Sequence, residues 1–245
     1  MILDLLKEQV QKKAAERSIV DVRIGLCYTG VLLDDGSTGV AFTFRDELGR
    51  GCLRRGGPFA GQRADAVIEG ITSPDLLERT VGIAAANALL SGRNSSFIEG
   101  DTLDVLEPGP DDVVGMVGYF GPVVPGLKRR VRELRIFEKK TMGDPDVYPE
   151  EKMFELLPSC TIALITSTAL INKTLEKILE VTRQCKKTAL AGASTPLARE
   201  VFKSRGVTLL SGIVITDPQG MLRVVSEGGG TRSFKGLVKK VNVTV

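Results

Sequence analysis

The 245-residue sequence contains no histidine and no tryptophan. Without histidine, a single chain cannot form a Ser-His-Asp or Cys-His catalytic system, an HExxH zinc site or a histidine general acid. Any chemistry must therefore rely on carboxylates, lysine, tyrosine, cysteine, hydroxyl groups or backbone N–H groups.

The sequence also lacks a CxxC pair, because its four cysteines, Cys27, Cys52, Cys160 and Cys185, are scattered. This spacing disfavours a zinc knuckle and a thioredoxin-type redox site. We expect buried, reduced thiols, since free cysteine behaves as a small core residue.

Long apolar runs are missing as well. The longest one, Val81 to Leu90, is interrupted by Asn87 and is far shorter than the ~20 residues of a membrane-spanning helix. It predicts a buried helix. The opening MILDLLKEQVQKKAAERS has helical spacing of its apolar residues and lacks the features of a signal peptide. The sequence therefore predicts a cytoplasmic protein without a membrane partner.

Charge is unevenly distributed along the chain. Residues 1–105 carry 12 Lys and Arg against 15 Asp and Glu, and residues 106–245 carry 21 against 15. A net charge of −3 beside one of +6 favours docking of the two halves and an anionic ligand on the second. No nucleic-acid partner is expected, because the basic run at 128–135 contains no interleaved aromatic residue.

Two domains are indicated by a break in the pattern at residues 99–112, which contain Pro108-Gly109-Pro110. Residues 1–105 read as a smaller α+β domain: a helix at about 2–17, strands around 20–27 and 39–44 with an Asp-Asp-Gly turn at 34–36, and a helix from Ser73-Pro74 to about Leu90.

Residues 106–245 show short apolar runs alternating with helix-length segments, which is typical of βαβ units on a mainly parallel sheet. The predicted fold is therefore α/β, with a Rossmann-like second domain. The expected strands are 113–120, 134–140, 161–166, 188–192, 207–216 and 221–225.

A glycine turn follows the first of these strands, with Gly118 and Gly121 on either side of Tyr119 and Phe120. Glu138 lies 20 residues after Gly118, a spacing suited to binding a ribose or similar diol. The dinucleotide fingerprint is absent, because Tyr119 or Phe120 replaces its middle glycine and Pro122 removes an N–H donor. We expect neither NAD nor FAD to bind usefully. The glycines could instead serve only to pack a strand against a helix.

Two later strand ends carry hydroxyl clusters. Thr166, Ser167 and Thr168 precede a helix expected to begin near Asn172, and Ser194 and Thr195 precede Pro196. Helix capping would explain both clusters. Helix N-termini at this edge of a parallel sheet also bind anions, so capping and ligand binding are compatible.

Two carboxylates are candidate catalytic groups. Glu138 ends the second strand, and Asp144 lies in the loop that follows it. Either could act as a general base or as a hydrogen-bond acceptor. Asp144 could equally be a surface turn residue.

The first domain offers Arg54, Arg55 and Asn87 as residues that could close the site. The two arginines lie in a Gly-rich loop and could face an anion or only solvent. Asn87 interrupts an apolar helix face, and a buried amide must form hydrogen bonds with the backbone or across the domain interface.

Taken in order, the segments ERTVGIAAANALL, VGYFGPVVPGL, FEKK, GDPD, ITSTALINKTL and AGASTPLAREVFKSRGVTLLSGIVITD resemble the family described as putative heavy-metal chelation proteins of unknown function. The resemblance covers essentially the whole chain. It implies an enolase N-terminal-like domain followed by a Rossmann-like domain with partial similarity to methyltransferases. It also implies a site shared by the two domains and a role in condensation or hydrolysis of flavin-, pterin- or siderophore-like molecules, linked to metal handling.

Two functions stay open on this sequence: an enzyme acting on a small anionic heterocyclic or chelating molecule, and a non-catalytic carrier of a metal–chelator complex. With no histidine and no cysteine cluster, the chain offers no soft ligand set for zinc, copper or nickel. If a metal takes part, we expect a bound organic chelator to supply most of its ligands. A homo-oligomer is compatible with the sequence.

Overall fold

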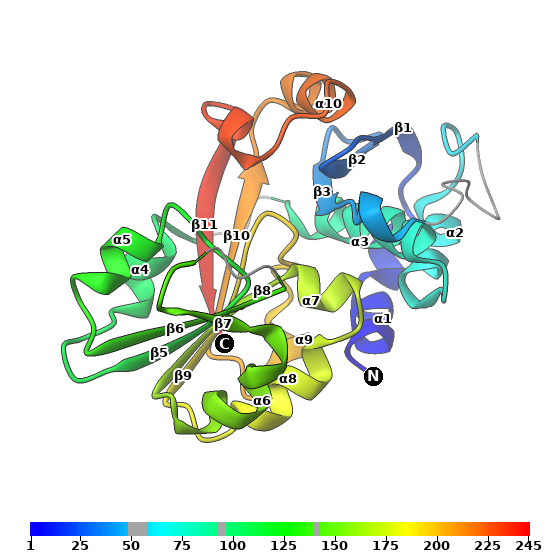
Figure 1. Ribbon diagram of the computed structural model, residues 1–245. Helices are drawn as coiled ribbons and strands as arrows, with labels where there is room; N and C mark the ends of the chain where they lie inside the picture. Colours follow the sequence, from blue (N-terminus) through cyan, green and yellow to red (C-terminus); the bar gives the residue numbers. More distant parts are fainter. Residues whose placement is uncertain (49–57, 93–96, 140–142) are drawn as a thin grey trace.

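The computed structural model describes residues 1–48, 58–92, 97–139 and 143–245. The chain forms two parts that lie side by side, each built on its own sheet, with the N-terminal part at the right of Figure 1. The mixed α/β architecture and the mainly parallel larger sheet confirm the predicted fold class.

The first part joins an antiparallel three-stranded sheet to five helical segments in the described residues. Its amphipathic first helix buries the apolar face that the sequence pattern predicts. The expected Asp-Asp-Gly turn connects β2 to β3, and Gly36 adopts the positive φ of +82° that such a turn requires. The elements are α1 (Ile2–Ala14), β1 (Ile19–Ile24), β2 (Tyr28–Leu33), β3 (Thr38–Phe42), η1 (Arg45–Glu47), α2 (Ala64–Ile68), η2 (Glu69–Thr72) and α3 (Leu76–Leu90).

Helix α3 is the central buried element of this part. It begins after Asp75, whose carboxylate accepts hydrogen bonds from the N–H groups of Leu77 and Glu78 at 2.9 and 3.0 Å. Most of its residues are buried, because β2 and β3 cover one side and α1 and α7 pack nearby. The helix and β3 touch through their backbones at Gly39.

The second part contains an eight-stranded sheet in the order β4-β11-β10-β9-β8-β5-β6-β7. Strands β5 to β10 run parallel, and β11 and β4 add an antiparallel extension. The strands are β4 (Ile98–Glu99), β5 (Val113–Val117), β6 (Glu133–Glu138), β7 (Val147–Pro149), β8 (Ile162–Thr166), β9 (Lys187–Ala191), β10 (Leu209–Ile215) and β11 (Val238–Thr244).

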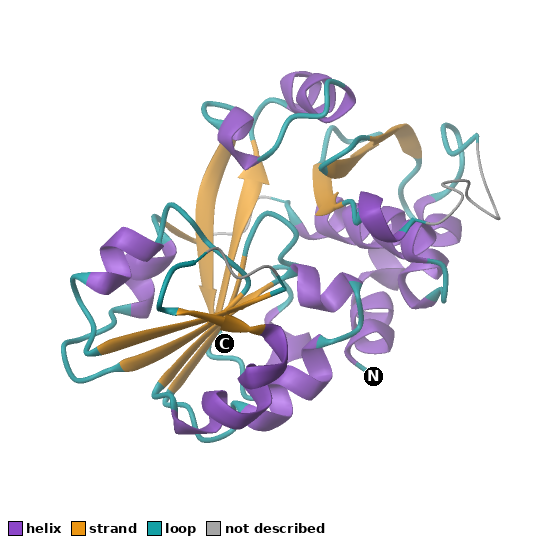
Figure 2. Cartoon of the chain, viewed as in Figure 1, coloured by secondary structure: helices purple, strands orange, loops and turns teal. Residues whose placement is uncertain are grey.

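Helices cover both faces of this sheet (Figure 2). Val114 and Met116 of β5 face α4 and α5, whereas Val113 and Val117 join a core that continues into α1 and α3 of the first part. Strand β4 precedes the boundary predicted between residues 105 and 106, α4 spans it, and both pack with the second sheet. The helical segments are α4 (Thr102–Leu106), α5 (Val124–Lys128), η3 (Glu150–Lys152), α6 (Met153–Leu156), η4 (Leu157–Ser159), α7 (Thr168–Ile171), α8 (Leu175–Val181) and α9 (Arg199–Lys203).

The strand predicted at 221–225 is wrong, because these residues belong to helix α10 (Pro218–Ser226). Asp217 caps this helix by accepting from the N–H of Gly220, and Pro218 occupies its first position. The buried residues of α10 lie on one helical face and, with Phe234 of η5 (Thr231–Phe234), pack on Tyr28 of the first part. The C-terminal segment therefore reaches back over the small sheet (Figure 1).

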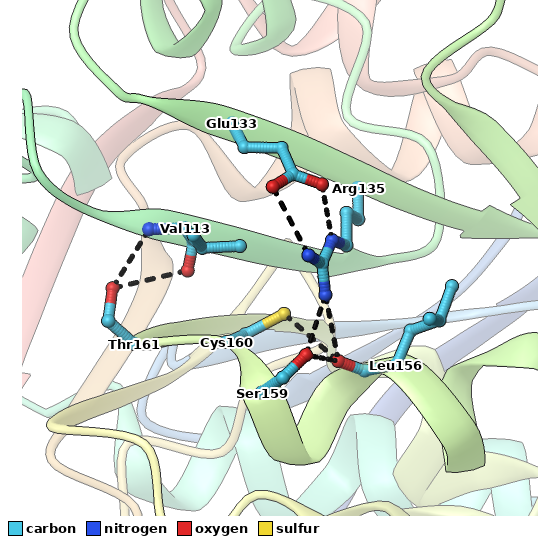
Figure 3. Close-up of polar contacts among 7 residues, drawn as sticks. All are labelled: Val113, Glu133, Arg135, Leu156, Ser159, Cys160 and Thr161. Carbon is cyan, nitrogen blue, oxygen red and sulfur yellow. Dashed lines mark hydrogen bonds and ion pairs between the residues drawn. The ribbon is translucent and has the colours of Figure 1, made fainter.

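Polar contacts between side chains lie at the amino-terminal end of the parallel strands of the large sheet (Figure 3). The guanidinium of Arg135 donates to Glu133 at 2.6 Å and to Ser159 Oγ at 2.7 Å, and the hydrogen bond to Glu133 lowers the pKa of that carboxyl. Nearby, Thr161 Oγ1 accepts from the N–H of Val113. Cys160 is buried there, and burial raises the pKa of its thiol.

Three cysteines lie in the described residues, and Cys27, Cys160 and Cys185 all carry free thiols. Cys52 falls outside that part of the chain. Among the described helices, none combines the length and the apolar character needed to cross a lipid bilayer.

Candidate functional site

A cavity of about 690 Å³ opens at the carboxyl ends of the parallel strands, between the two parts. It lies at the switch point of the sheet, because β6 follows β5 on one side and β8 lies on the other. The second part contributes Val117, Gly118, Tyr119, Phe137, Glu138, Lys139, Glu150, Thr166, Thr168, Ala169, Asn172, Thr174 and Ile178, and the first part contributes Leu26, Cys27 and residues 42–47.

The glycine turn after β5 is closed by Glu138. Gly118 has a φ of +85°, and a Cβ there would lie 3.0 Å from the Thr166 side chain. Glu138 accepts hydrogen bonds from the N–H of Tyr119 at 3.1 Å and of Lys139 at 2.8 Å. The N–H of Tyr119, which could have cradled a phosphate, is therefore already donated to the protein's own carboxylate.

The end of β8 carries a pair of hydroxyls. Thr166 Oγ1 and Thr168 Oγ1 lie 2.9 Å apart, and both residues line the cavity. Ser167 between them points elsewhere: it is buried beside Gly192, and its Oγ has no hydrogen-bond partner in the described residues. Thr166 and Thr168 thus reach the cavity, whereas Ser167 does not line it.

Asn172 lines the cavity, and its amide nitrogen is available to a ligand within the described residues. It follows α7 rather than starting a helix as expected, since α8 begins at Leu175. Its Oδ1 accepts from the N–H and the Oγ1 of Thr174 at 3.2 and 2.7 Å. Within the described chain its Nδ2 has no hydrogen-bond partner, which leaves two N–H donors for a ligand.

The first part supplies an apolar wall that the sequence analysis missed. Leu26 and Cys27 come from the β1–β2 turn, and Phe42 and Phe44 come from the end of β3. The rings of Phe42 and Phe44 meet edge to face, with centroids 5.1 Å apart. In a chain with only 9 Phe and 3 Tyr, the Phe-x-Phe pair at the end of the strand predicted at 39–44 was the available signal.

Charged side chains lie around the cavity. Lys139 Nζ of the second part and Glu47 Oε1 of the first lie 2.9 Å apart, and this contact raises the pKa of Lys139. Arg45 pairs with Asp46 at 3.5 Å. With Glu138 and Glu150, the described lining holds four carboxylates and two cationic groups, so the cavity wall is acidic although the second half of the chain is basic.

Asn87 and Ser194, both predicted at the site, instead cap the outer edge of β3. Asn87 Nδ2 donates to the carbonyls of Val40 and Ser194 at 2.9 and 3.2 Å, and Ser194 Oγ accepts from the N–H of Phe42 at 2.8 Å. Thr195 Oγ1 donates to the carbonyl of Gly192. Asn87 and Ser194 thus join the two parts, and Asn87 and Thr195 line a void of about 10 Å³, close to the space of one water molecule.

Asp144, Phe120 and Gly121 are not among the residues that line the cavity. Asp144 receives a hydrogen bond from the N–H of Asp146 and an ion pair from Lys128 at 3.2 Å, which together hold the pKa of its carboxyl below the usual value. Phe120 packs on the core under α4 and α5, and Gly121 is not among the lining residues. Arg54 and Arg55 fall outside the described residues.

The described residues include no cluster of three or more His, Cys, Asp or Glu side chains arranged to hold a metal ion. The lining combines apolar and aromatic groups with hydrogen-bonding groups, which suits an organic molecule.

Comparison with known proteins agrees with this architecture. Two sequence profiles, both described as putative heavy-metal chelation, match residues 7–90 and 101–244. An uncharacterized protein of Methanocaldococcus jannaschii is 28% identical over 256 residues, which span 100% of this chain and 98% of that protein.

Two crystal structures of proteins of unknown function, from the family whose profile matches residues 101–244, share the fold. The one from Pyrococcus horikoshii is 26% identical with a TM-score of 0.88, and the match covers 100% of both chains. The one from Desulfitobacterium hafniense is 20% identical with a TM-score of 0.83, covering 100% of this chain and 98% of that one.

Proposed function

This chain belongs to the family described as putative heavy-metal chelation, and from that membership and the cavity lining we propose that it binds a small ring-shaped chelator between its two parts. The observation that carries the proposal is the composite cavity itself. Its volume of about 690 Å³ falls in the range of small-molecule sites, and both parts contribute to its wall.

The lining suits a flat heterocycle of the flavin or pterin type, or an aromatic siderophore-like chelator. The edge-to-face pair of Phe42 and Phe44, with Leu26 beside it, offers an apolar surface for a ring. From the second part, Asn172 Nδ2 can donate, and the hydroxyls of Thr166 and Thr168 can donate or accept. This combination of hydrogen-bond donors and acceptors matches the carbonyl and N–H groups on the edge of these heterocycles.

The charge of the cavity lining indicates which groups the ligand should carry. The sequence predicted an anionic molecule, but four carboxylates face two cationic groups in the described lining, and each cationic group is already paired. We therefore propose that the end of the ligand facing Glu138 and Glu150 carries hydrogen-bond donors or positive charge. A chelator that supplies most of the metal's ligands fits the complete absence of histidine from the sequence.

Binding without turnover is the function that the geometry supports best. Both oxygens of Glu138, the candidate base that lines the cavity, already accept backbone N–H groups, and Asp144, the other candidate base, lies outside the cavity lining. The second candidate function is condensation or hydrolysis of the ligand, which the family resemblance implies.

Native mass spectrometry of the protein as purified tests binding directly, because a co-purifying molecule would appear as added mass. Calorimetry with lumazine, riboflavin and the ferric complex of 2,3-dihydroxybenzoate then tests the three ring classes. We expect stoichiometric binding of at least one of them and no product by chromatography. If there is no bound mass and no binding of any probe, the proposal fails.

Replacing Asn172 by Asp should weaken binding of the tightest of these probes roughly tenfold, because a donor pair becomes a charged acceptor while the acceptor for Thr174 is kept. The matched control is Asp144→Asn, which lies outside the cavity and should change affinity less than about twofold. Equal affinity of Asn172→Asp and wild type in calorimetry would remove Asn172 from the site.

Cys27 offers a second readout of occupancy. In a Cys52→Ser background, iodoacetamide at pH 8 should label Cys27 more than about tenfold faster than Cys160 and Cys185. Burial raises the pKa of the Cys160 thiol and raises that of Cys185 to about 11, whereas Cys27 is partly exposed and is the one of the three that lines the cavity. A saturating probe should slow the Cys27 reaction, as peptide mass spectrometry would show. Unchanged labelling would place the probe elsewhere.

A further inference from the structure

Sheet edges are protected at three of the four places where the described sheets end. An exposed edge invites pairing with another chain, so proteins shorten it, place proline in it or cover it. Strand β4 has 2 residues, and β7 has 3 and ends in Pro149. The outer edge of β3 is capped by Asn87 and Ser194.

Strand β1 forms the fourth edge, and within the described residues its outer side, away from β2, is paired only at its beginning. The N–H of Ile19 donates to the carbonyl of Gln62, and the N–H of Gly61 donates to that of Ile19, both at 2.8 Å. From Val20 to Ile24 no other segment of the described chain pairs with this edge. The strand ends where Gly25 turns back towards β2.

The free stretch presents both backbone groups and apolar side chains. Because Gly25 donates to the carbonyl of Tyr28, the antiparallel alternation turns the N–H and C=O of Val22 and Ile24 outward. Val20 is 50% exposed and Ile24 is 43% exposed. This edge contains no proline, and its two charged residues, Asp21 and Arg23, are of opposite sign.

We propose that β1 pairs with β1 of a second copy of this chain, antiparallel, across a two-fold axis at Val22. In this register Val20 lies opposite Ile24 of the partner subunit, and Asp21 lies opposite Arg23 of the partner subunit. Two-fold symmetry repeats each contact, so two apolar pairs and two pairs of opposite charge form.

The neighbouring registers are disfavoured by charge. An axis at Asp21 sets the two Asp21 side chains directly opposite each other, and an axis at Arg23 does the same for arginine. Like charges opposite each other destabilise an antiparallel pair. The segment at Gln62 and the turn at Gly25 also bound the free edge, so the five-residue pairing centred on Val22 uses all of it.

Sedimentation velocity of the full chain over a concentration series tests the pairing. We expect a concentration-dependent equilibrium between 26.3 kDa and twice that mass. Asp21→Arg should raise the dissociation constant roughly tenfold or more, because it sets arginine opposite arginine twice. The double exchange Asp21→Arg with Arg23→Asp should restore it to within about threefold of wild type.

Ile24→Lys provides an independent test, because it places a charge on the exposed edge without touching the Asp21–Arg23 ion pair. It should leave the protein monomeric, with a melting temperature close to that of the wild-type monomer. A wild-type protein that is monomeric at every concentration overturns the proposal. So does a dimer that neither Asp21→Arg nor Ile24→Lys weakens, since another surface would then form it.

Discussion

Gly39→Ala should destabilise the protein by about 3 kcal/mol or more, which corresponds to a fall in melting temperature of roughly 10 °C. A Cβ at this position would lie 2.2 Å from the backbone nitrogen of Ala88 and 2.3 Å from the carbonyl oxygen of Ala84. Both atoms belong to the backbone of α3, so no side chain can move aside. Strand β3 must separate from the helix, and differential scanning calorimetry measures the cost.

The matched control is Gly230→Ala, because a Cβ at Gly230 meets nothing within 4 Å. It should change stability by less than about 0.5 kcal/mol. The Gly39 variant should also lose affinity for ring probes, since β3 carries Phe42 to the cavity wall. Similar melting temperatures for the two variants would contradict the close approach of β3 and α3.

Arg79→Met should cost about 2 to 4 kcal/mol and weaken probe binding as well. Arg79 is 5% exposed, and its guanidinium donates to the carbonyls of Ser73, Pro74 and Ile171. Burial lowers the pKa of this group. Removing it leaves buried carbonyls without donors, including that of Ile171, the residue immediately before Asn172. The stability loss is measured by urea unfolding and the affinity by calorimetry.

Arg63→Met is the control for loss of an arginine. Arg63 pairs with Asp65 on the surface, and its side chain is 62% exposed. An exposed ion pair contributes little, so the expected change is below about 0.5 kcal/mol. If Arg79→Met proved as mild as this control, the guanidinium would not be joining the two parts.

Local patterns predicted most of the fold because each depends on neighbouring residues. The spacing of apolar residues identified α1 and α3, and the Asp-Asp-Gly turn identified the hairpin of β2 and β3. The error at 221–225 has a local cause as well, since five largely apolar residues fit a strand or a helix. The Asp217-Pro218 start was the signal that distinguishes them.

The candidate site was only partly accessible from sequence. Gly118, Glu138 and Thr166 could be grouped because parallel strands end at one edge of a sheet. The wall from Leu26 to Phe44 depends on how the two parts dock, and a charge count does not say which faces meet. Asn87 shows the same limit: its sequence context demanded a hydrogen-bond partner, but only the fold identifies the edge of β3 as that partner.

The core shared by the two parts has a consequence during synthesis. The apolar faces of α1 and α3 pack with residues of β8, α7, α8 and α9, which lie at positions 162–203. At 5 to 20 residues per second, roughly 5 to 25 s separate translation of α3 from translation of α9. For that interval the nascent first half exposes surface that only the later half can cover. Chaperones that bind apolar segments therefore have a defined time window on this chain.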